Sequence, residues 1–179
     1  MFPKTNKHFL FFHNFKFKTM ELLTRINADD VVKKEPEMNG KEIISKFFEA
    51  QGKQDVQGMA DVLTENIVFE MPFALPGLPD RVEGKGTVVE FLEQFLGKER
   101  GIFTGWSLHN IRIYPGGDPG LFFAELDGQG VVAQSGYQYR QKYIILFRVS
   151  NGLISQWREY TNPTPLREAL VSAGQYRSE

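Results

Sequence analysis

Apolar and polar residues alternate most regularly between Tyr137 and Thr161. Nearly every second residue from Tyr137 to Val149 is apolar or aromatic, Asn151-Gly152 follows, and the alternation resumes through Trp157. A period of two is typical of a β-strand, and Asn-Gly favours a tight type I′ turn between two strands. The pattern therefore predicts strands over residues 138–150 and 153–161, joined as a hairpin.

Apolar residues spaced three and four positions apart predict four helices. The clearest stripe follows Asn39, which is placed to cap the helix together with Glu42. We expect the helices after Asn39, over residues 55–63, after a capping box of Thr87 and Glu90, and after Thr164 as cap. Gly52, Gly97 and Gly174 are expected to end the first, third and fourth of them.

Three further strands are expected from alternation, one before the third helix and two after it. They cover residues 66–73, 106–114 and 121–132, and a Pro/Gly-rich loop, ALPGLPD, follows the first. Helices that precede a run of hairpin-linked strands indicate an α+β fold. We expect one strongly bent antiparallel sheet that wraps the N-terminal helices and forms a cone with an apolar mouth.

The chain is long enough for one domain with a substantial core, because it has 179 residues of which 41% are hydrophobic. We assign residues 39–175 to this domain, residues 1–38 to a disordered or extended lead-in, and residues 176–179 to a tail. Residues 1–19 are rich in Phe and Lys and contain no acid. We interpret them as a translated upstream extension with the natural start at Met20, in preference to a membrane-surface anchor.

Charge and composition exclude several classes of function. Without residues 1–19 the chain keeps 17 basic residues (21 − 4) and 22 acidic ones, a net charge of −5. No basic surface is therefore expected for nucleic acid or an anionic membrane, and no apolar run approaches the ~20 residues of a membrane span. The absence of cysteine excludes disulfides and thiolate nucleophiles and fits a cytoplasmic location. His109 is the only histidine after residue 19, which excludes a multi-histidine metal site, and no metal is expected.

Glu159 is the strongest candidate for chemistry. It shares a strand face with Leu153 and Trp157. A carboxyl group at the end of an apolar strand face loses hydration on folding, so it must be paired, protonated or used.

Two interpretations of Glu159 follow from this position. In the functional one, Trp157, Phe73 and Tyr143 surround the carboxyl group and raise its pKa, so that it donates a proton at neutral pH. In the structural one, Glu159 is solvated or paired with a basic residue such as Arg140 or Lys142.

Other polar side chains are weaker candidates for the same site. Asp127 and Glu125 lie two residues apart and share a strand face, so Asp127 is either a second acid or amine-binding group, or part of a local bend at Asp127-Gly128. Tyr139 and Tyr143, with Tyr137, also share a face, where they either stack on an aromatic ligand or pack in a core or subunit contact.

Particular residues connect the chain to a known family. The order of elements over residues 40–175 resembles the NTF2-like superfamily and its SnoaL-like branch. The segments Ala124–Gly130 and Arg158–Pro163 are most similar to the phenazine-biosynthesis A/B proteins. The REYTNP run matches the REF-x-NP run of that family. This resemblance implies that Glu159 is an acid–base glutamate in the cone.

The chain departs from its relatives at other functional positions. Lys85 stands near the place where the phenazine proteins have a histidine, in an RGH-type start to the third helix. Ketosteroid isomerases of the same fold have a catalytic aspartate and tyrosine where this chain has Met71 and, by position, Phe47. The isomerase machinery is therefore not expected here.

Two functions remain as hypotheses. The first is a cofactor-free enzyme that binds a small hydrophobic or aromatic metabolite through Tyr143, Trp157, Phe73, Asp127 and Tyr139. In it, Glu159 assists a condensation, cyclisation or isomerisation in secondary-metabolite biosynthesis. The second is a non-catalytic ligand-binding or dimerisation module of the same fold, which a cavity without titratable groups would favour. A homodimer is expected through an outward set of residues on the last two strands, Ile144, Leu146 and Ile154.

Overall fold

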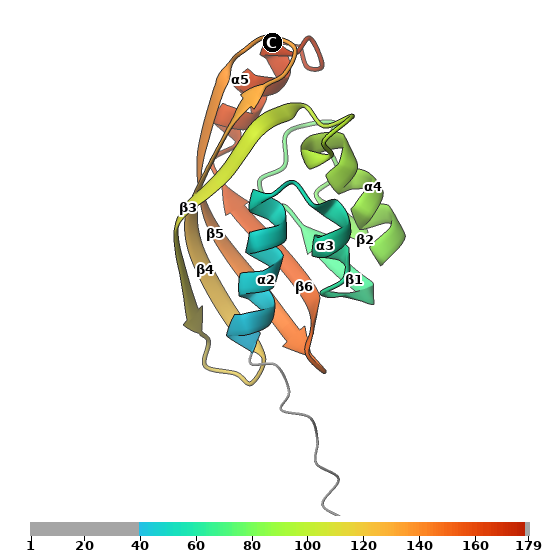
Figure 1. The fold of residues 1–179 in the computed structure, drawn as a ribbon, viewed down its shortest axis with the longest axis vertical. Helices are drawn as coiled ribbons and strands as arrows, with labels where there is room; N and C mark the ends of the chain where they lie inside the picture. The colour runs from blue at the N-terminus through green and yellow to red at the C-terminus, as the bar shows by residue number, and fades with distance from the viewer. Residues whose placement is uncertain (1–39, 178–179) are drawn as a thin grey trace, which may run out of the picture. The chain divides into compact units, whose positions relative to one another are not determined.

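Four helices and six strands make up residues 40–177, the part of the chain that the computed structural model describes (Figure 1). The helices are α2 (Gly40–Gly52), α3 (Val56–Ala60), α4 (Lys85–Leu96) and α5 (Pro163–Ser172). The strands are β1 (Leu63–Glu70), β2 (Arg81–Glu83), β3 (Phe103–Pro115), β4 (Leu121–Val132), β5 (Gln138–Ser150) and β6 (Leu153–Thr161). The predicted lead-in over residues 1–38, the start at Met20 and the cap Asn39 lie outside the described residues.

The strands form one sheet in the order β2-β1-β6-β5-β4-β3. Figure 1 shows this sheet curving around α2, α3 and α4, while α5 lies at one end of the long strands. The predicted α+β fold with N-terminal helices is confirmed. The sheet is mixed and not purely antiparallel, because β1 pairs with β6 in parallel. The long chain segment between these two strands imposes no direction on their pairing, unlike a tight hairpin turn.

The hairpin of β5 and β6 has the bounds that the alternation predicted. Asn151 and Gly152 both have positive φ, 51° and 72° respectively, as a type I′ turn requires. The strand β4 also has its predicted bounds. A register shift between Arg148 and Val149 changes which side chains of β6 face inward. Ile154, predicted to point outward, is therefore fully buried.

Two helices begin earlier than predicted. Helix α4 begins at Lys85 with Gly84 as its N-cap, so Thr87 lies inside the helix and does not cap it. Gly84 has a φ of 83°, a conformation that glycine adopts most readily. In α5, the side-chain oxygen of Asn162 accepts a hydrogen bond from the backbone nitrogen of Thr164, 3.0 Å away, so Asn162 is the cap.

The segments around β1 also differ from the sequence prediction. Helix α3 ends at Ala60, and β1 already begins at Leu63. The strand ends at Glu70, short of Phe73, and a turn follows in which the backbone nitrogen of Ala74 donates to the carbonyl of Met71. The short strand β2 then pairs with the end of β1, a non-local contact that no periodicity indicated.

The core lies between α2 and the concave face of the sheet. Phe47 and Phe48 of α2 contact the ring of Phe147 edge to face, with centroids 5.7 and 5.6 Å apart. Phe47 also meets Trp157 of β6 at 4.8 Å. This packing fixes the inner face of β6 against α2 and so positions the residues that follow Trp157 along the strand.

Candidate functional site

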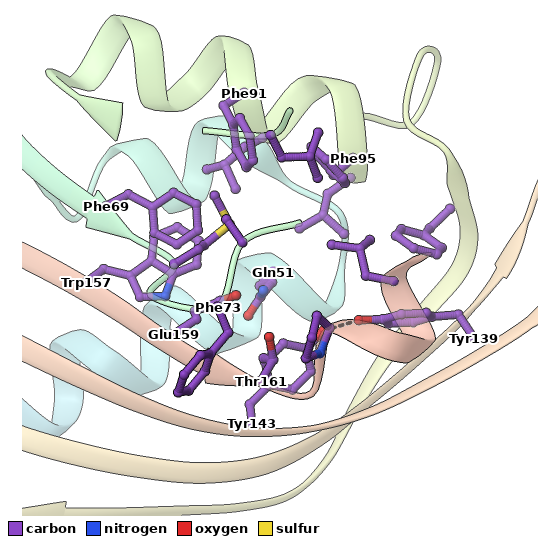
Figure 2. Close-up of a pocket in the computed structure, with 18 of the residues that line it drawn as sticks. Gln51, Phe69, Phe73, Phe91, Phe95, Tyr139, Tyr143, Trp157, Glu159 and Thr161 are labelled. Atoms are coloured by element: carbon purple, nitrogen blue, oxygen red, sulfur yellow. Dashed lines mark hydrogen bonds between the residues drawn. The ribbon is translucent and has the colours of Figure 1, made fainter. Parts of the chain in front are cut away.

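A cavity of about 90 Å³ lies on the concave side of the sheet (Figure 2). This volume is several times the ~10–15 Å³ that one water requires. The residues that line it come from the end of α2, β1, the loop after β1, α4, β3, β5, β6 and α5: Gln51, Phe69, Met71, Phe73, Ala74, Leu78, Phe91, Leu92, Phe95, Leu96, Phe103, Trp106, Tyr139, Tyr143, Trp157, Glu159, Thr161, Pro163 and Leu166.

Glu159 is the one carboxyl group among these residues. It lies near the end of β6, opposite Ile145 of β5, and Figure 2 shows its side chain directed into the cavity. The described residues form no ion pair with it. Arg140 and Lys142 are exposed and border a groove apart from the cavity. The predicted alternative of a pair between Glu159 and one of these two residues is therefore wrong.

Burial changes the charge state of Glu159. Loss of hydration in the aromatic surroundings raises the pKa of its carboxyl group from 4.5 to about 8. The neighbouring Trp157 indole opposes this rise, because its N–H favours the carboxylate. Its geometry falls short of a full hydrogen bond, so the indole nitrogen remains without a partner. At neutral pH the group is mostly protonated and can donate a proton.

Aromatic rings form two ends of the cavity. At one end Phe69 of β1 stacks on Trp157, with centroids 4.1 Å apart and planes 28° apart. At the other end Trp106 of β3 stacks on Tyr139 of β5 at 5.8 Å and 24°. Figure 2 shows Phe69 and Trp157 on the side away from Tyr139. The space between these stacks is bounded by flat, apolar surfaces that suit a planar molecule.

The hydroxyl groups of Tyr139 and Tyr143 form a hydrogen-bonded pair in the cavity wall, 3.1 Å apart (Figure 2). Burial raises the pKa of both phenols, and the nearby Glu159 adds to the effect. Both side chains are therefore neutral throughout the physiological range. Only one of the two hydroxyl protons is needed for the pair, so the other can be donated to a ligand.

Two glycines in β4 make room for the rings of this wall. A Cβ atom on Gly128 would approach the Tyr143 ring to 2.8 Å, and one on Gly130 would approach the Trp106 ring to 2.9 Å. Any larger residue would push these rings into the cavity. The segment that resembles the phenazine proteins thus has a physical role in shaping the cavity, although its Asp127 has a different position.

The structure brings five of the six predicted site residues together. Glu159, Trp157, Tyr143, Tyr139 and Phe73 all line the cavity, with Phe73 exposed at its edge. Asp127 does not line it. Its carboxylate accepts a hydrogen bond of 2.7 Å from the side chain of Asn110, which has positive φ at an irregularity in β3. The bend that the sequence predicted at Asp127-Gly128 of β4 therefore lies on the paired strand β3.

Several cavity residues were not identified from the sequence. Gln51, Phe91, Phe95 and Trp106 come from three separate elements, and no local pattern links them to Glu159. Gln51 did carry a signal, since it follows Phe47 by four positions and therefore places a polar group on the apolar stripe of α2. A buried glutamine on such a stripe suggests a polar role at the end of the helix.

The residues at which the chain departs from its relatives are also placed. Lys85 lies outside the cavity and pairs with Glu65 at 2.8 Å. Met71 lines the cavity, whereas Phe47 is fully buried in the core. Neither Lys85 nor Phe47 is in a position to assist Glu159.

Two other kinds of feature are absent from residues 40–177. No group of three or more His, Asp or Glu side chains there is arranged to hold a metal ion. Within the same residues, none of the helices combines the length and apolarity needed to cross a membrane.

The sequence of the chain matches a family model and a curated protein. Residues 44–157 match the model of the SnoaL-like domain, so that Glu159 lies two residues beyond the matched segment. The chain is 32% identical over 133 residues to the PhzA/B-like protein PA3332 of Pseudomonas aeruginosa, an alignment that covers 74% of this chain and 91% of the relative.

Two solved structures have the same fold. A candidate isomerase from Bacillus subtilis is 28% identical, with a TM-score of 0.67 over 74% of this chain and 93% of its own. The phenazine-biosynthesis-related protein PhzB2 of Pseudomonas aeruginosa is 22% identical, with a TM-score of 0.64 over 80% of this chain and 89% of its own. The second likeness is evidence for the fold alone.

Proposed function

We propose, from the premise that this chain belongs to the SnoaL-like family, that it is an enzyme of secondary metabolism with Glu159 as its general acid–base. Its substrate is a small hydrophobic, cyclic or aromatic metabolite that enters the cavity. The reaction is an acid–base-assisted condensation, cyclisation or isomerisation, of the kind that the name of the phenazine relatives suggests.

The position of Glu159 in an aromatic cavity, without an ion-pair partner among residues 40–177, is the observation that carries this proposal. General acids act best when their pKa lies near the working pH, and a pKa of about 8 meets that condition. Glu159 donates its proton to a substrate carbonyl oxygen, which gives the substrate a positive charge and acidifies the neighbouring C–H or N–H group. The resulting carboxylate then removes a proton from the neighbouring carbon or nitrogen, so the group returns to its starting state without a cofactor.

A two-step experiment tests the proposal. A thermal-shift screen of the full chain against aminoketones, lactones, steroids and polycyclic aromatic acids identifies a class that stabilises the protein. Turnover of that class is then measured with the wild-type protein, Glu159→Gln and the control Glu70→Gln. We expect Glu159→Gln to lose about 10²–10⁴-fold in rate, and Glu70→Gln to stay within a few fold. Equal turnover by wild type and Glu159→Gln would exclude the assigned role.

The wild-type pH dependence provides a second check. Because the donating form of Glu159 is protonated, the rate of the acid-catalysed step should fall as the pH rises through about 8. Glu159→Gln has no such group, so its residual rate should not fall in that range.

The alternative is a non-catalytic ligand-binding or dimerisation module. The presence of Glu159 in the cavity favours the enzyme, because a purely apolar binding site has no need of a neutralised carboxyl group. The second class draws support from an apolar patch on the outer face of the sheet. We define this outer patch as Tyr114, Phe123, Ile144 and Leu146, of which the first three are exposed.

We further propose that the outer patch is the contact of a homodimer. Its residues lie side by side, because Tyr114 pairs with Phe123 and Phe123 pairs with Leu146 across the sheet. A contiguous apolar surface of this kind is stabilised by burial against a second copy. Ile144→Glu should shift the protein from dimer to monomer in light scattering, while the control Lys46→Glu, exposed on α2 at the opposite face of the sheet, retains the dimer. A wild-type monomer would exclude this contact.

A cytoplasmic location remains our proposal from the lack of cysteine.

A further inference from the structure

Buried polar atoms without a partner concentrate around the cavity. Four side-chain atoms in residues 40–177 are buried and have no hydrogen bond: Gln51 Oε1, Thr64 Oγ1, Trp106 Nε1 and Trp157 Nε1. Three of the four belong to residues that line the cavity. Each such atom destabilises the folded protein when it is left unsatisfied. Native proteins rarely leave them so, and their clustering at a cavity indicates that a molecule within it, water or a ligand that displaces water, completes the hydrogen bonds.

The chemistry of these atoms restricts the ligand. The two indole nitrogens can only donate, and the protonated Glu159 donates as well. The Gln51 amide carries both a donor and an acceptor and can present either one by rotating about its last bond. The cavity therefore offers mainly donors, and the complementary ligand must bring acceptors, as the oxygen of a ketone or an aldehyde does.

The charge of the cavity restricts the ligand further. Of the described residues that line the cavity, none is Arg, Lys or His. An ionised carboxylate that entered would leave water without meeting a cation, which is costly in an apolar site. An ammonium group would need Glu159 to ionise in the same apolar surroundings, and the indole N–H groups would have no acceptor. A neutral ligand avoids both costs.

The shape of the walls completes the description. Nine of the nineteen lining residues are aromatic, and the stacks at Trp157 and Trp106 present flat faces. The volume of about 90 Å³ suits a ligand part of about one ring, and a larger ligand would extend past Phe73 at the exposed edge.

We propose that this cavity selects an uncharged, planar ligand whose carbonyl oxygen accepts hydrogen bonds from Glu159 and an indole N–H, and that it rejects the carboxylate of the same ring. The inference rests on the proposed function, in that the cavity around Glu159 is taken as the site. It adds the charge state and the hydrogen-bonding group of the substrate.

Four single-ring probes of matched size test this selectivity: acetophenone, benzoate, benzylamine and toluene. Their dissociation constants for the full chain are measured by NMR titration at pH 6.5, where benzoate is an anion and benzylamine a cation. We expect acetophenone to bind at least tenfold more tightly than benzoate or benzylamine, and several-fold more tightly than toluene.

Variants test which side chains cause the preference for acetophenone over the other probes. Trp157→Phe and Trp106→Phe keep an aromatic ring and remove one donor each, so at least one of them should weaken acetophenone several-fold while toluene is unaffected. Thr161→Lys combined with Glu159→Gln places a cation in the cavity without an opposing carboxyl group and should strengthen benzoate at least tenfold. If that variant does not fold, the two Phe variants still decide the role of the donors.

The outcomes separate this inference from the proposed function. Binding of benzoate or benzylamine as tight as that of acetophenone would overturn the inference and leave the cavity as the site. Equal binding of toluene and acetophenone would overturn the role of the carbonyl oxygen. If none of the four probes binds, both the inference and the proposed site fail.

Discussion

Glu70 and Glu159 are two glutamates on neighbouring strands with opposite electrostatics. Glu70 of β1 lies opposite Arg158 of β6, so the two carboxyl groups are one residue apart in register and project to opposite faces of the sheet. The Glu70 side chain is only 15% exposed, and Glu159 is half-buried. The degree of burial therefore does not explain why the pKa of Glu70 is lowered while that of Glu159 is raised.

The partners explain the difference. The Glu70 carboxylate accepts hydrogen bonds from Arg158 at 2.8 Å, Gln156 at 2.7 Å and Arg81 at 2.7 Å. The Arg158 guanidinium is the main cause of its lowered pKa. Among residues 40–177 no cation pairs with Glu159, and loss of hydration dominates. The alternation of β6 thus gives one face a structural ion pair that joins β1 to β6, and the other face an acid available for chemistry.

The largest expected effect is on the pH dependence of stability. The unfolded Glu159 ionises near pH 4.5 and the folded one near pH 8, so it makes the native state progressively less stable as the pH rises between these values. Glu159→Gln removes this loss, which amounts to at most about 1.4 kcal/mol per pH unit. Urea unfolding at pH 5 and pH 8 should show that the variant gains roughly 3 kcal/mol relative to wild type between them. A constant difference across this range would mean that Glu159 is ionised in the folded protein.

The second effect has the opposite sign and a different pH range. Glu70→Gln should destabilise the protein by about 1–2 kcal/mol at pH 7, because two hydrogen bonds from charged donors lose their charged acceptor. The pKa of Glu70 is lowered, so its contribution is present above pH 4.5 and is lost as the pH falls through its folded pKa. The gap between variant and wild type should therefore close in acid.

Glu125 provides a control for the second effect. Glu125→Gln alters a pair with Arg112 on the exposed surface, and we expect little change in the urea midpoint. If Glu125→Gln lowers the free energy of unfolding as much as Glu70→Gln does, the burial of the ion pair between Glu70 and Arg158 does not strengthen it.

The smallest expected effect is that of the Trp157 indole on the pKa of Glu159. Trp157→Phe removes the indole N–H that favours the carboxylate, so the pKa of Glu159 should rise further. NMR titration of the labelled carboxyl group measures the shift directly. Trp106→Phe is the matched control, because Trp106 does not contribute to the pKa of Glu159. Equal shifts in the two variants would assign the effect to packing.

The sequence alone was sufficient where the structure is local. The bounds of β4, β5 and β6 follow from alternation and from the Asn151-Gly152 turn, since side-chain direction and turn geometry depend on neighbouring residues. The same alternation placed Glu159 beside Trp157 on the inner face. Helix starts were less well determined, because Asn162 and Thr164 are both good caps and each precedes a proline.

Only the tertiary structure decided the remaining features. The parallel pairing of β1 with β6, the strand β2 and the inward turn of Ile154 depend on contacts between distant segments or on a register shift. The cavity likewise combines Gln51 of α2 and Trp106 of β3 with Glu159 of β6. Residue type and strand period determined that a carboxyl group faces the core. Its charge depends on which side chains meet there, because hydration and Coulomb interactions act through space and not along the chain.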